Sequence, residues 1–410
     1  MNLIERIKNI GPGALVAAAF IGPGTVTTAT VTGADYGFTL LWAMVFSIFA
    51  TVVLQEMSMR LGVISNEGLG EALRGEFDNP TLKNISVFLV VVAIGIGAVA
   101  FEAGNIMGGA LGLETITGIQ ANIWGPIIGI IAFILLWIGS YKFVERILVG
   151  LVVLMSVAFV VTAITLRPDF GEIITGMIIP SIPEDGGLAT VVALIGTTVV
   201  PYNLFLHASS VQERWDSPED LKTARFDTIF SIILGGIISL SIIITAAATF
   251  HGTGIVIEDG GQMAQQLEPV LGQWAMWFFA IGLFGAGFSS AVTAPLAAAY
   301  ATTGALGWEK GMNAKGFRAI WMIVLFVGII ASGLGASPVQ LIVFAQAANG
   351  ILLPVSAIYL VWVMNNEKRL GEYTNTTLNN ILGGIVLIVS IILGARLLYM
   401  NVVEPLLGLI

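Results

Sequence analysis

Gly22-Pro23-Gly24-Thr25 interrupts one long apolar segment of this 410-residue chain, and Val200-Pro201-Tyr202-Asn203 interrupts another. Proline lacks a backbone donor and clashes with the preceding helical turn, so each stretch predicts a helix that is broken near its middle. Backbone groups freed at membrane depth are tolerated only where they are buried in protein or line a cavity. Broken helices in corresponding halves of a chain are typical of binding sites at the bilayer midplane.

The composition indicates an integral membrane protein. Hydrophobic residues make up 56% of the chain and charged residues 10%, and the mean hydropathy is +0.93. A soluble surface needs roughly a quarter to a third charged residues. Segments of about 20 apolar residues, the length that crosses a bilayer, recur along the chain. We expect about eleven spans, at residues 12–36, 39–62, 84–110, 122–141, 144–166, 188–211, 226–250, 272–303, 318–335, 339–364 and 379–400.

The two breaks lie in the first and sixth spans, which are equivalent positions in a five-plus-five inverted repeat. The predicted fold is therefore an all-α transmembrane fold built on such a repeat, in a single domain over residues 1–410. We expect the first repeat at about 10–166, the second at about 188–364, and an extra helix at about 379–400. The first span is expected to remain uncleaved, because its loss would remove one of the two breaks.

Basic residues set the expected orientation, because Lys and Arg are retained on the cytoplasmic side. With the N-terminus inside, all Lys and Arg except Arg167 and Arg396 fall on inner segments. We therefore expect a multi-pass protein of the inner or plasma membrane, with a cytoplasmic N-terminus and an outer C-terminus.

Enzyme chemistry finds no support in the sequence. There is no phosphate-binding glycine loop followed by Lys and Ser or Thr, no zinc motif and no cysteine, and the chain has 2 histidines. We expect no enzymatic activity, no cofactor and no nucleic-acid partner. The expected partners are the lipid bilayer and an ion or small-molecule substrate; the oligomeric state and any coupling proton or ion stay open.

Further motifs extend over nearly the whole chain: Ile10-Gly11-Pro12-Gly13, Tyr36-Gly37, Leu41-Trp42, Leu54-Gln55, Arg60-Leu61-Gly62, Pro201-Tyr202-Asn203-Leu204-Phe205-Leu206-His207, Ala248-Thr249-Phe250-His251-Gly252 and Gln346 to Pro354. Together with the first break, they resemble the natural resistance-associated macrophage protein (NRAMP) family of divalent-metal transporters. The resemblance implies a LeuT-like fold that works by alternating access.

The positions that differ from the family pattern fall on the site that the resemblance implies. Gly22 and Thr25 stand where the family has its metal-binding aspartate and asparagine, and Val200 stands where it has a methionine. Tyr202 replaces a histidine, and Val99 replaces an acid on the third span. Because the only carboxylate and the only soft ligand are both lost, no residue is assigned as a metal ligand.

The candidate residues form a hydroxyl-rich, uncharged lining between the first, third, sixth and tenth spans. The expected substrate-binding positions are Gly22, Thr25, Thr197, Thr198, Val200, Tyr202, Asn203 and Gln346. Glu102 and His207 are the candidates for proton or ion coupling, although each also has a structural interpretation, as a buried packing acid and as a hydrogen-bonded core histidine. Thr27, Thr28 and Thr30 are expected to bond to their own helix backbone, as transmembrane threonines commonly do.

The sequence leaves three functional hypotheses open. A dication in a site of low dielectric faces a desolvation cost of tens of kcal/mol, normally offset by a carboxylate. Transport of manganese or iron is therefore not expected, and a hydrated hard cation such as magnesium is the metal candidate, since it keeps several waters. The alternatives are a non-metal solute (a small anion, a zwitterion or a neutral molecule) and a non-transporting sensor.

Overall fold

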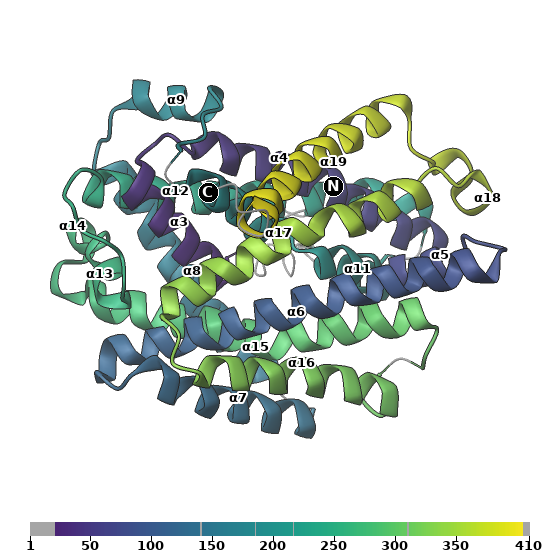
Figure 1. The fold of residues 1–410 in the computed structure, drawn as a ribbon, viewed down its shortest axis with the longest axis horizontal. Helices are drawn as coiled ribbons and strands as arrows, with labels where there is room; N and C mark the ends of the chain where they lie inside the picture. The colour runs from purple at the N-terminus through teal and green to yellow at the C-terminus, as the bar shows by residue number, and fades with distance from the viewer. Residues whose placement is uncertain (1–20, 140–141, 185, 216, 310, 405–410) are drawn as a thin grey trace.

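The computed structural model describes residues 21–139, 142–184, 186–215, 217–309 and 311–404, and these are almost entirely helical (Figure 1). Within them, 10 helical segments are long and apolar enough to cross a membrane. The predicted span 12–36 lies partly outside the described residues; its second part is helix α3 (Pro23–Tyr36). The all-helical fold expected from composition is confirmed.

The helices that follow α3 alternate with short connections. The long ones are α4 (Leu41–Ser65), α6 (Pro80–Thr117), α7 (Ala121–Ile138) and α8 (Lys142–Thr165). Two short helices join them or follow them: α5 (Leu69–Arg74) and α9 (Phe170–Ile178). Local chemistry fixes the ends of α6, because Asn79 accepts hydrogen bonds from the amides of Thr81 and Leu82, and Gly118 closes the other end at a φ of 70°.

The second half begins with an interrupted helix. Its long elements are α10 (Gly187–Thr198), α11 (Pro201–Ser210), α12 (Leu221–Phe250), α15 (Ala275–Leu306), α16 (Lys315–Gly333), α17 (Pro338–Val363) and α19 (Thr377–Leu398). The short helices are α13 (Gly260–Gln265), α14 (Glu268–Leu271) and α18 (Glu367–Leu370). The ten predicted spans from 39–62 onward coincide with these helices, and their ends differ by at most seven residues; residues 140–141 of the span 122–141 lie outside the described residues.

Proline alone does not decide where a helix breaks. Pro126, Pro295 and Pro354 lie inside the continuous helices α7, α15 and α17, whereas Pro201 starts a new helix. Neighbouring helices can satisfy the single carbonyl that an internal proline frees. At Pro201 the preceding residues also leave the helical conformation, so the whole turn is lost.

Helix α6 lies at the centre of the fold, with α15, α16 and α17 alongside it (Figure 1). Glycines allow the close approaches. A Cβ on Gly287 of α15 would lie 2.6 Å from the Cα of Gly109 of α6. Helix α17 also packs closely against α10. A Cβ on Gly196 of α10 would overlap the backbone of α17, and a Cβ on Gly350 of α17 would overlap the backbone of α10, so the two helices are in direct backbone contact.

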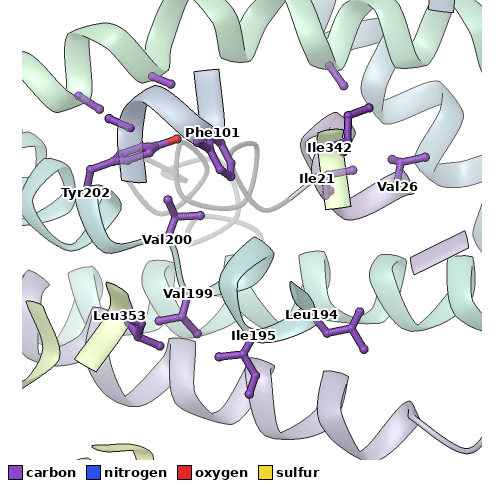
Figure 2. Close-up of a cluster of buried hydrophobic side chains, with 14 of the residues drawn as sticks. Ile21, Val26, Phe101, Leu194, Ile195, Val199, Val200, Tyr202, Ile342 and Leu353 are labelled. Atoms are coloured by element: carbon purple, nitrogen blue, oxygen red, sulfur yellow. The ribbon is translucent and has the colours of Figure 1, made fainter. Parts of the chain in front are cut away.

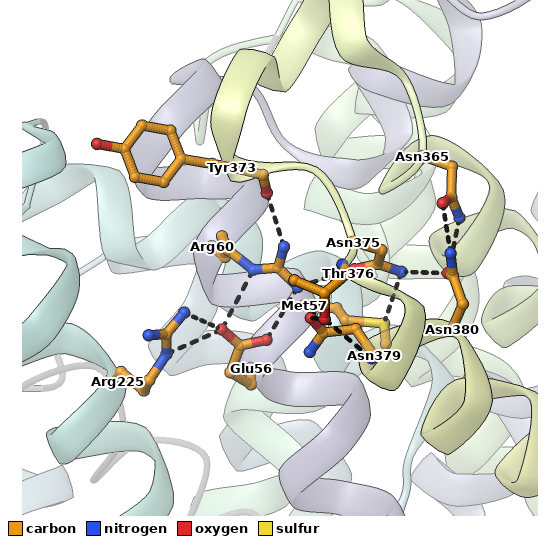
Figure 3. A network of polar contacts seen from close by, with 10 residues as sticks. All are labelled: Glu56, Met57, Arg60, Arg225, Asn365, Tyr373, Asn375, Thr376, Asn379 and Asn380. Carbon is orange, nitrogen blue, oxygen red and sulfur yellow. Dashed lines mark hydrogen bonds and ion pairs between the residues drawn. The ribbon is translucent and has the colours of Figure 1, made fainter.

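A polar network joins α4 to α12 and to the connection before α19, at the end predicted to face the cytoplasm (Figure 3). Glu56 of α4 pairs with Arg60 at 3.1 Å and with Arg225 of α12 at 2.7 Å. Arg60 also donates to the carbonyl oxygen of Tyr373 at 2.7 Å and to Oδ1 of Asn375 at 2.8 Å. Because Arg60 is buried, these bonds fix the end of α4 against a connection that carries no long helix of its own.

Candidate substrate site

The break in the sixth span consists of Val199 and Val200, which separate α10 from α11. Val200 is extended, with φ −74° and ψ 122°, as expected for a residue before proline. The hydroxyl of Thr198 donates to the carbonyls of Leu194 and Ile195, at 3.0 and 3.1 Å. Thr198 therefore satisfies part of the end of α10, and its hydroxyl points back along its own helix.

The break in the first span is described from Ile21 onward. Gly22 is the N-cap residue of α3, in an extended conformation with φ −73° and ψ 171°, and Pro23 occupies the first helical position. The first helical bond runs from the amide of Val26 to the carbonyl of Gly22, at 3.2 Å. Helices α3 and α11 both begin without a side-chain cap, because neither Gly22 nor Val200 accepts a hydrogen bond through its side chain.

The two breaks meet through a pair of hydroxyl groups. Oγ1 of Thr25 lies 2.9 Å from Oγ1 of Thr197 in α10, and both residues are buried. This hydrogen bond joins the interrupted spans directly, through one side chain of each. The sequence placed both threonines at the site, and the structure brings them into contact.

Gln346 of α17 lies against the first turn of α3. A Cβ on Gly24 would overlap its Nε2 and lie 2.9 Å from its Oε1, and a Cβ on Gly104 of α6 would lie 3.6 Å from Nε2. The side chain is fully buried, and neither atom of its amide has a hydrogen-bond partner among the described residues. Three helices therefore converge on one carboxamide that is free to bind another group.

Apolar side chains form the remaining surroundings of the second break (Figure 2). Tyr202 packs edge to face against Phe101 of α6, with ring centroids 5.5 Å apart and an interplanar angle of 78°. Val200 is buried in the same hydrophobic cluster. Asn203, a predicted site residue, is buried one position beyond Tyr202.

Glu102 lies in α6 but faces a different helix. Its Cγ would be 2.7 Å from a Cβ on Gly328 of α16, and its carboxylate interacts electrostatically with Tyr202. Neither carboxylate oxygen has a hydrogen bond of ordinary geometry within the described chain, although Asn105, one turn further, is near enough to interact. Asn105 was not predicted; its spacing of three residues from Glu102 in an apolar helix is the signal that could have identified it.

His207 does not join the other candidates. It is fully buried in α11, and its Nδ1 donates to Oε1 of Gln55 at 2.8 Å, while the hydroxyl of Thr228 lies 3.5 Å from its Nε2. The structural interpretation of this histidine, as a hydrogen-bonded core residue, describes its environment. Gln55 had been recognised only as part of a family motif.

The expectation for three further threonines of α3 is wrong. The hydroxyls of Thr27 and Thr28 have no hydrogen-bond partner among the described residues, and Thr30 accepts from Nε2 of Gln266 at 3.0 Å. Gln266 also accepts from Thr245 of α12, at 2.9 Å. Gln266 lies in the connection between α13 and α14, where no helical spacing could reveal its contact with Thr30.

Metal-binding chemistry is sparse in this region. Among the described residues, no group of three or more His, Cys, Asp or Glu side chains is placed to hold a metal ion. The groups that do converge are hydroxyls, a carboxamide and helix ends, none of which carries a formal charge.

The model for the family described as "Natural resistance-associated macrophage protein-like" matches residues 13–400. The chain belongs to this family. A "Divalent metal cation transporter MntH" of Caldanaerobacter subterraneus is 29% identical over 409 residues, which cover 98% of this chain and 95% of that protein. The NRAMP resemblance drawn from the motifs is thereby confirmed.

Solved structures place the NRAMP fold of this chain among LeuT-like transporters. A mutant of the manganese transporter of Eremococcus coleocola matches with a TM-score of 0.78 at 20% identity, over 96% of this chain and 86% of that one. MhsT in complex with L-phenylalanine matches with a TM-score of 0.60 at 15% identity, over 94% and 97%. At these identities the likeness concerns the fold, and it confirms the predicted fold class.

Proposed function

We propose that this NRAMP-family protein is a secondary-active transporter, working by alternating access, whose substrate binds between α3, α10, α17 and α6. The observation that carries the proposal is the contact of Thr25 with Thr197, which joins both interrupted spans beside the unpaired amide of Gln346. Polar groups without partners in a protein core are costly unless a ligand or water satisfies them. The orientation with a cytoplasmic N-terminus is part of the same proposal and rests on the distribution of Lys and Arg.

The site does not suit a dehydrated transition metal. Gly22 and Val200 offer no ligand side chain, and Thr25 offers a neutral hydroxyl at a position where the family has asparagine. The desolvation cost of a dication then lacks a compensating negative charge. Among divalent cations, a hydrated hard ion such as magnesium remains the candidate, because neutral oxygens and retained waters suit it.

A cavity with acidic residues on its lining is the candidate route for cation entry, although none of the predicted site residues lines it. It has a volume of about 970 Å³ between α3, α10, α17 and α19, and the exposed carboxylates of Asp35 and Glu258 lie on its lining. Acidic groups at the mouth of a cleft raise the local concentration of cations.

A non-metal solute is the second candidate, and the starts of α3 and α11 favour it. Helix N-termini carry a partial positive charge, which no side chain at Gly22 or Val200 offsets. An anionic or zwitterionic solute would complement these ends.

We further propose that Glu102 carries the coupling proton and that His207 positions α11 through Gln55. Glu102 is an ionisable residue deep in a span, with no cationic partner among the described side chains. Such residues are functional candidates by default, because they are costly to keep.

Transport assays in proteoliposomes test this proposal. The purified protein is reconstituted with a magnesium-sensitive or a manganese-sensitive dye inside, and flux is measured with and without an inward proton gradient. We expect no manganese flux above that of empty liposomes. Saturable magnesium flux would support the metal candidate, and absence of flux for magnesium and for every organic solute examined would contradict transport and support a sensor.

A further inference from the structure

The start of α3 is suited to bind an anion. The helix has 14 residues, its N-cap Gly22 has no side chain, and Pro23 supplies no amide hydrogen. The first helical bond is formed by Val26, so the amide of Gly24 precedes it and has no backbone partner among the described residues. A helix start of this kind binds a carboxylate through its amide group and its dipole.

A second and independent feature points to the same place. The carboxamide of Gln346 comes from α17, lies on Gly24, is fully buried and has both atoms unpaired within the described residues. Its Nε2 can donate to an anion at the start of α3. Its Oε1 can only accept, so a halide or another ion without hydrogens would leave this oxygen unsatisfied.

We propose that the substrate is a small organic carboxylate with a hydrogen-bond donor, an amino or hydroxyl group, on the adjacent carbon. This inference rests on the proposed function of the site as a transport site. The carboxylate accepts from the amide of Gly24 and from Nε2 of Gln346, and the adjacent donor binds Oε1. The substrate thus supplies the negative charge that a side chain at position 22 supplies in the family pattern. The apolar cluster around Val200 and Phe101 contacts its carbon atoms.

The nearby acids lie away from the two groups that would hold the carboxylate, the amide of Gly24 and the side chain of Gln346. Glu102 and Gly104 are two residues apart in α6, so they lie on nearly opposite sides of that helix, about 200° apart. Gln346 contacts the side that carries Gly104, and Glu102 faces α16. Asp35 and Glu258 on the outer cavity are exposed, so salt screens them, and they affect the rate of entry more than the affinity.

Binding measurements on the full-length protein in lipid nanodiscs test the proposal. The probes are glycolate, L-lactate, glycine and L-alanine, and binding is followed by calorimetry and by thermal unfolding. Propionate lacks the adjacent donor, and lactamide lacks the carboxylate. We expect at least one of the four probes to bind, propionate to bind about tenfold more weakly or worse, and lactamide not to bind. No response to any of the four probes, or equal binding of L-lactate and lactamide, would overturn the proposal.

Two variants test the location. Gly22→Asp places a carboxylate at the start of α3 and is expected to abolish binding of the probe. Gln273→Glu adds the same charge at an exposed residue of the connection between α14 and α15, and this variant should bind normally. Gln346→Met keeps the length of the side chain but removes both polar atoms, and about a tenfold loss of affinity is expected. Retention of wild-type affinity in either site variant would place the carboxylate elsewhere. If Gly22→Asp does not fold, Gln346→Met still tests the location of the site, and the comparison of L-lactate with lactamide on the wild-type protein still tests the need for a carboxylate.

Counterflow separates this inference from the proposed function. Proteoliposomes loaded with the bound probe should accumulate the labelled probe, and this exchange should fail in Gly22→Asp. Magnesium flux without carboxylate binding would refute the carboxylate and leave a transporter in place. Failure of both kinds of flux in folded protein would refute transport itself.

Discussion

The hydroxyl oxygens of Thr25 and Thr197 lie 2.9 Å apart and form a direct side-chain hydrogen bond between the two interrupted spans. The residues are 172 positions apart in the sequence and belong to α3 and α10. The bond therefore stabilises the arrangement of α3 against α10 that the structure shows.

Replacement of either threonine by valine should destabilise this arrangement. Thr25→Val or Thr197→Val removes one partner of this buried hydrogen bond, and the free energy of unfolding should fall by about 1–3 kcal/mol. The double variant should cost less than the sum of the two single ones, because the pair acts as a unit. Thermal unfolding in detergent measures the effect. Thr198→Val is the matched control, since its hydroxyl bonds only to α10 itself, and strictly additive single effects would refute the pair.

A methyl group at Gly24 should disrupt the Gln346 amide. The Cβ of Gly24→Ala would overlap Nε2 and force the carboxamide away from the start of α3, with an overpacking cost of about 1–3 kcal/mol. We expect a lower unfolding temperature and loss of substrate response in the same binding assay.

Gly95→Ala is the control for that change. It lies in α6, where an added Cβ meets nothing within 4 Å, so the variant should unfold at the wild-type temperature or slightly above it, as alanine favours helix. Equal behaviour of Gly24→Ala and Gly95→Ala would show that the amide does not occupy the position described.

The helical fold could be predicted from the sequence because long apolar segments have few alternatives in a bilayer. The break at Pro201 was predicted correctly, and α3 begins at Pro23 as predicted, although the earlier part of that span lies outside the described residues. Pro126 and Pro295 show that proline by itself would have predicted too many breaks. Before Pro201 two residues leave the helical conformation, whereas Pro126 and Pro295 lie within continuous helices, and the sequence alone does not distinguish the two cases.

The site could be predicted only in part. Thr25, Thr197 and Gln346 were predicted to lie at one site and do lie near one another. The prediction was possible because matching a family motif assigns each residue to a place in the family's fold. Asn105 and Gln266 were missed, since their roles arise from which helix faces pack against each other. Glu102 was predicted as a coupling residue; its side chain faces α16, and the coupling role stays a prediction.

The polar network at the other end of α4 makes a stability prediction (Figure 3). Arg60→Gln removes bonds from a buried guanidinium to Glu56, Tyr373 and Asn375, and should cost about 1–3 kcal/mol. Arg225→Gln removes a side chain that is 45% exposed, and should cost less than about 1 kcal/mol. Unfolding of both variants in one detergent gives the comparison. A larger loss of stability in Arg225→Gln would show that Arg225, and not Arg60, makes the main stabilising contact of this network.

Restoring the family ligands should restore manganese binding. Gly22→Asp with Thr25→Asn and Val200→Met returns a carboxylate, an amide oxygen and a thioether to positions around the breaks. We expect the wild-type protein to show no manganese binding by calorimetry and the triple variant to bind it. Gly22→Asp alone should bind more weakly, since it lacks the soft ligand. A folded triple variant that stays silent would indicate that the pocket has changed beyond these three positions.

Glu102 makes the sharpest prediction about coupling. If its carboxyl carries the coupling proton, Glu102→Gln keeps the size and the neutral polarity of the protonated acid but cannot release a proton. Substrate binding and the unfolding temperature should then stay near the wild-type values, since the side chain lies on the side of α6 away from Gln346. Uptake driven by a proton gradient should fall sharply, whereas exchange of substrate without a gradient should persist.

Asn105→Ala, which removes the neighbouring amide without touching the carboxyl, should shift the pH dependence of uptake and leave coupling intact. Full proton-driven uptake in Glu102→Gln would remove this residue from the mechanism and leave it a packing role against Gly328.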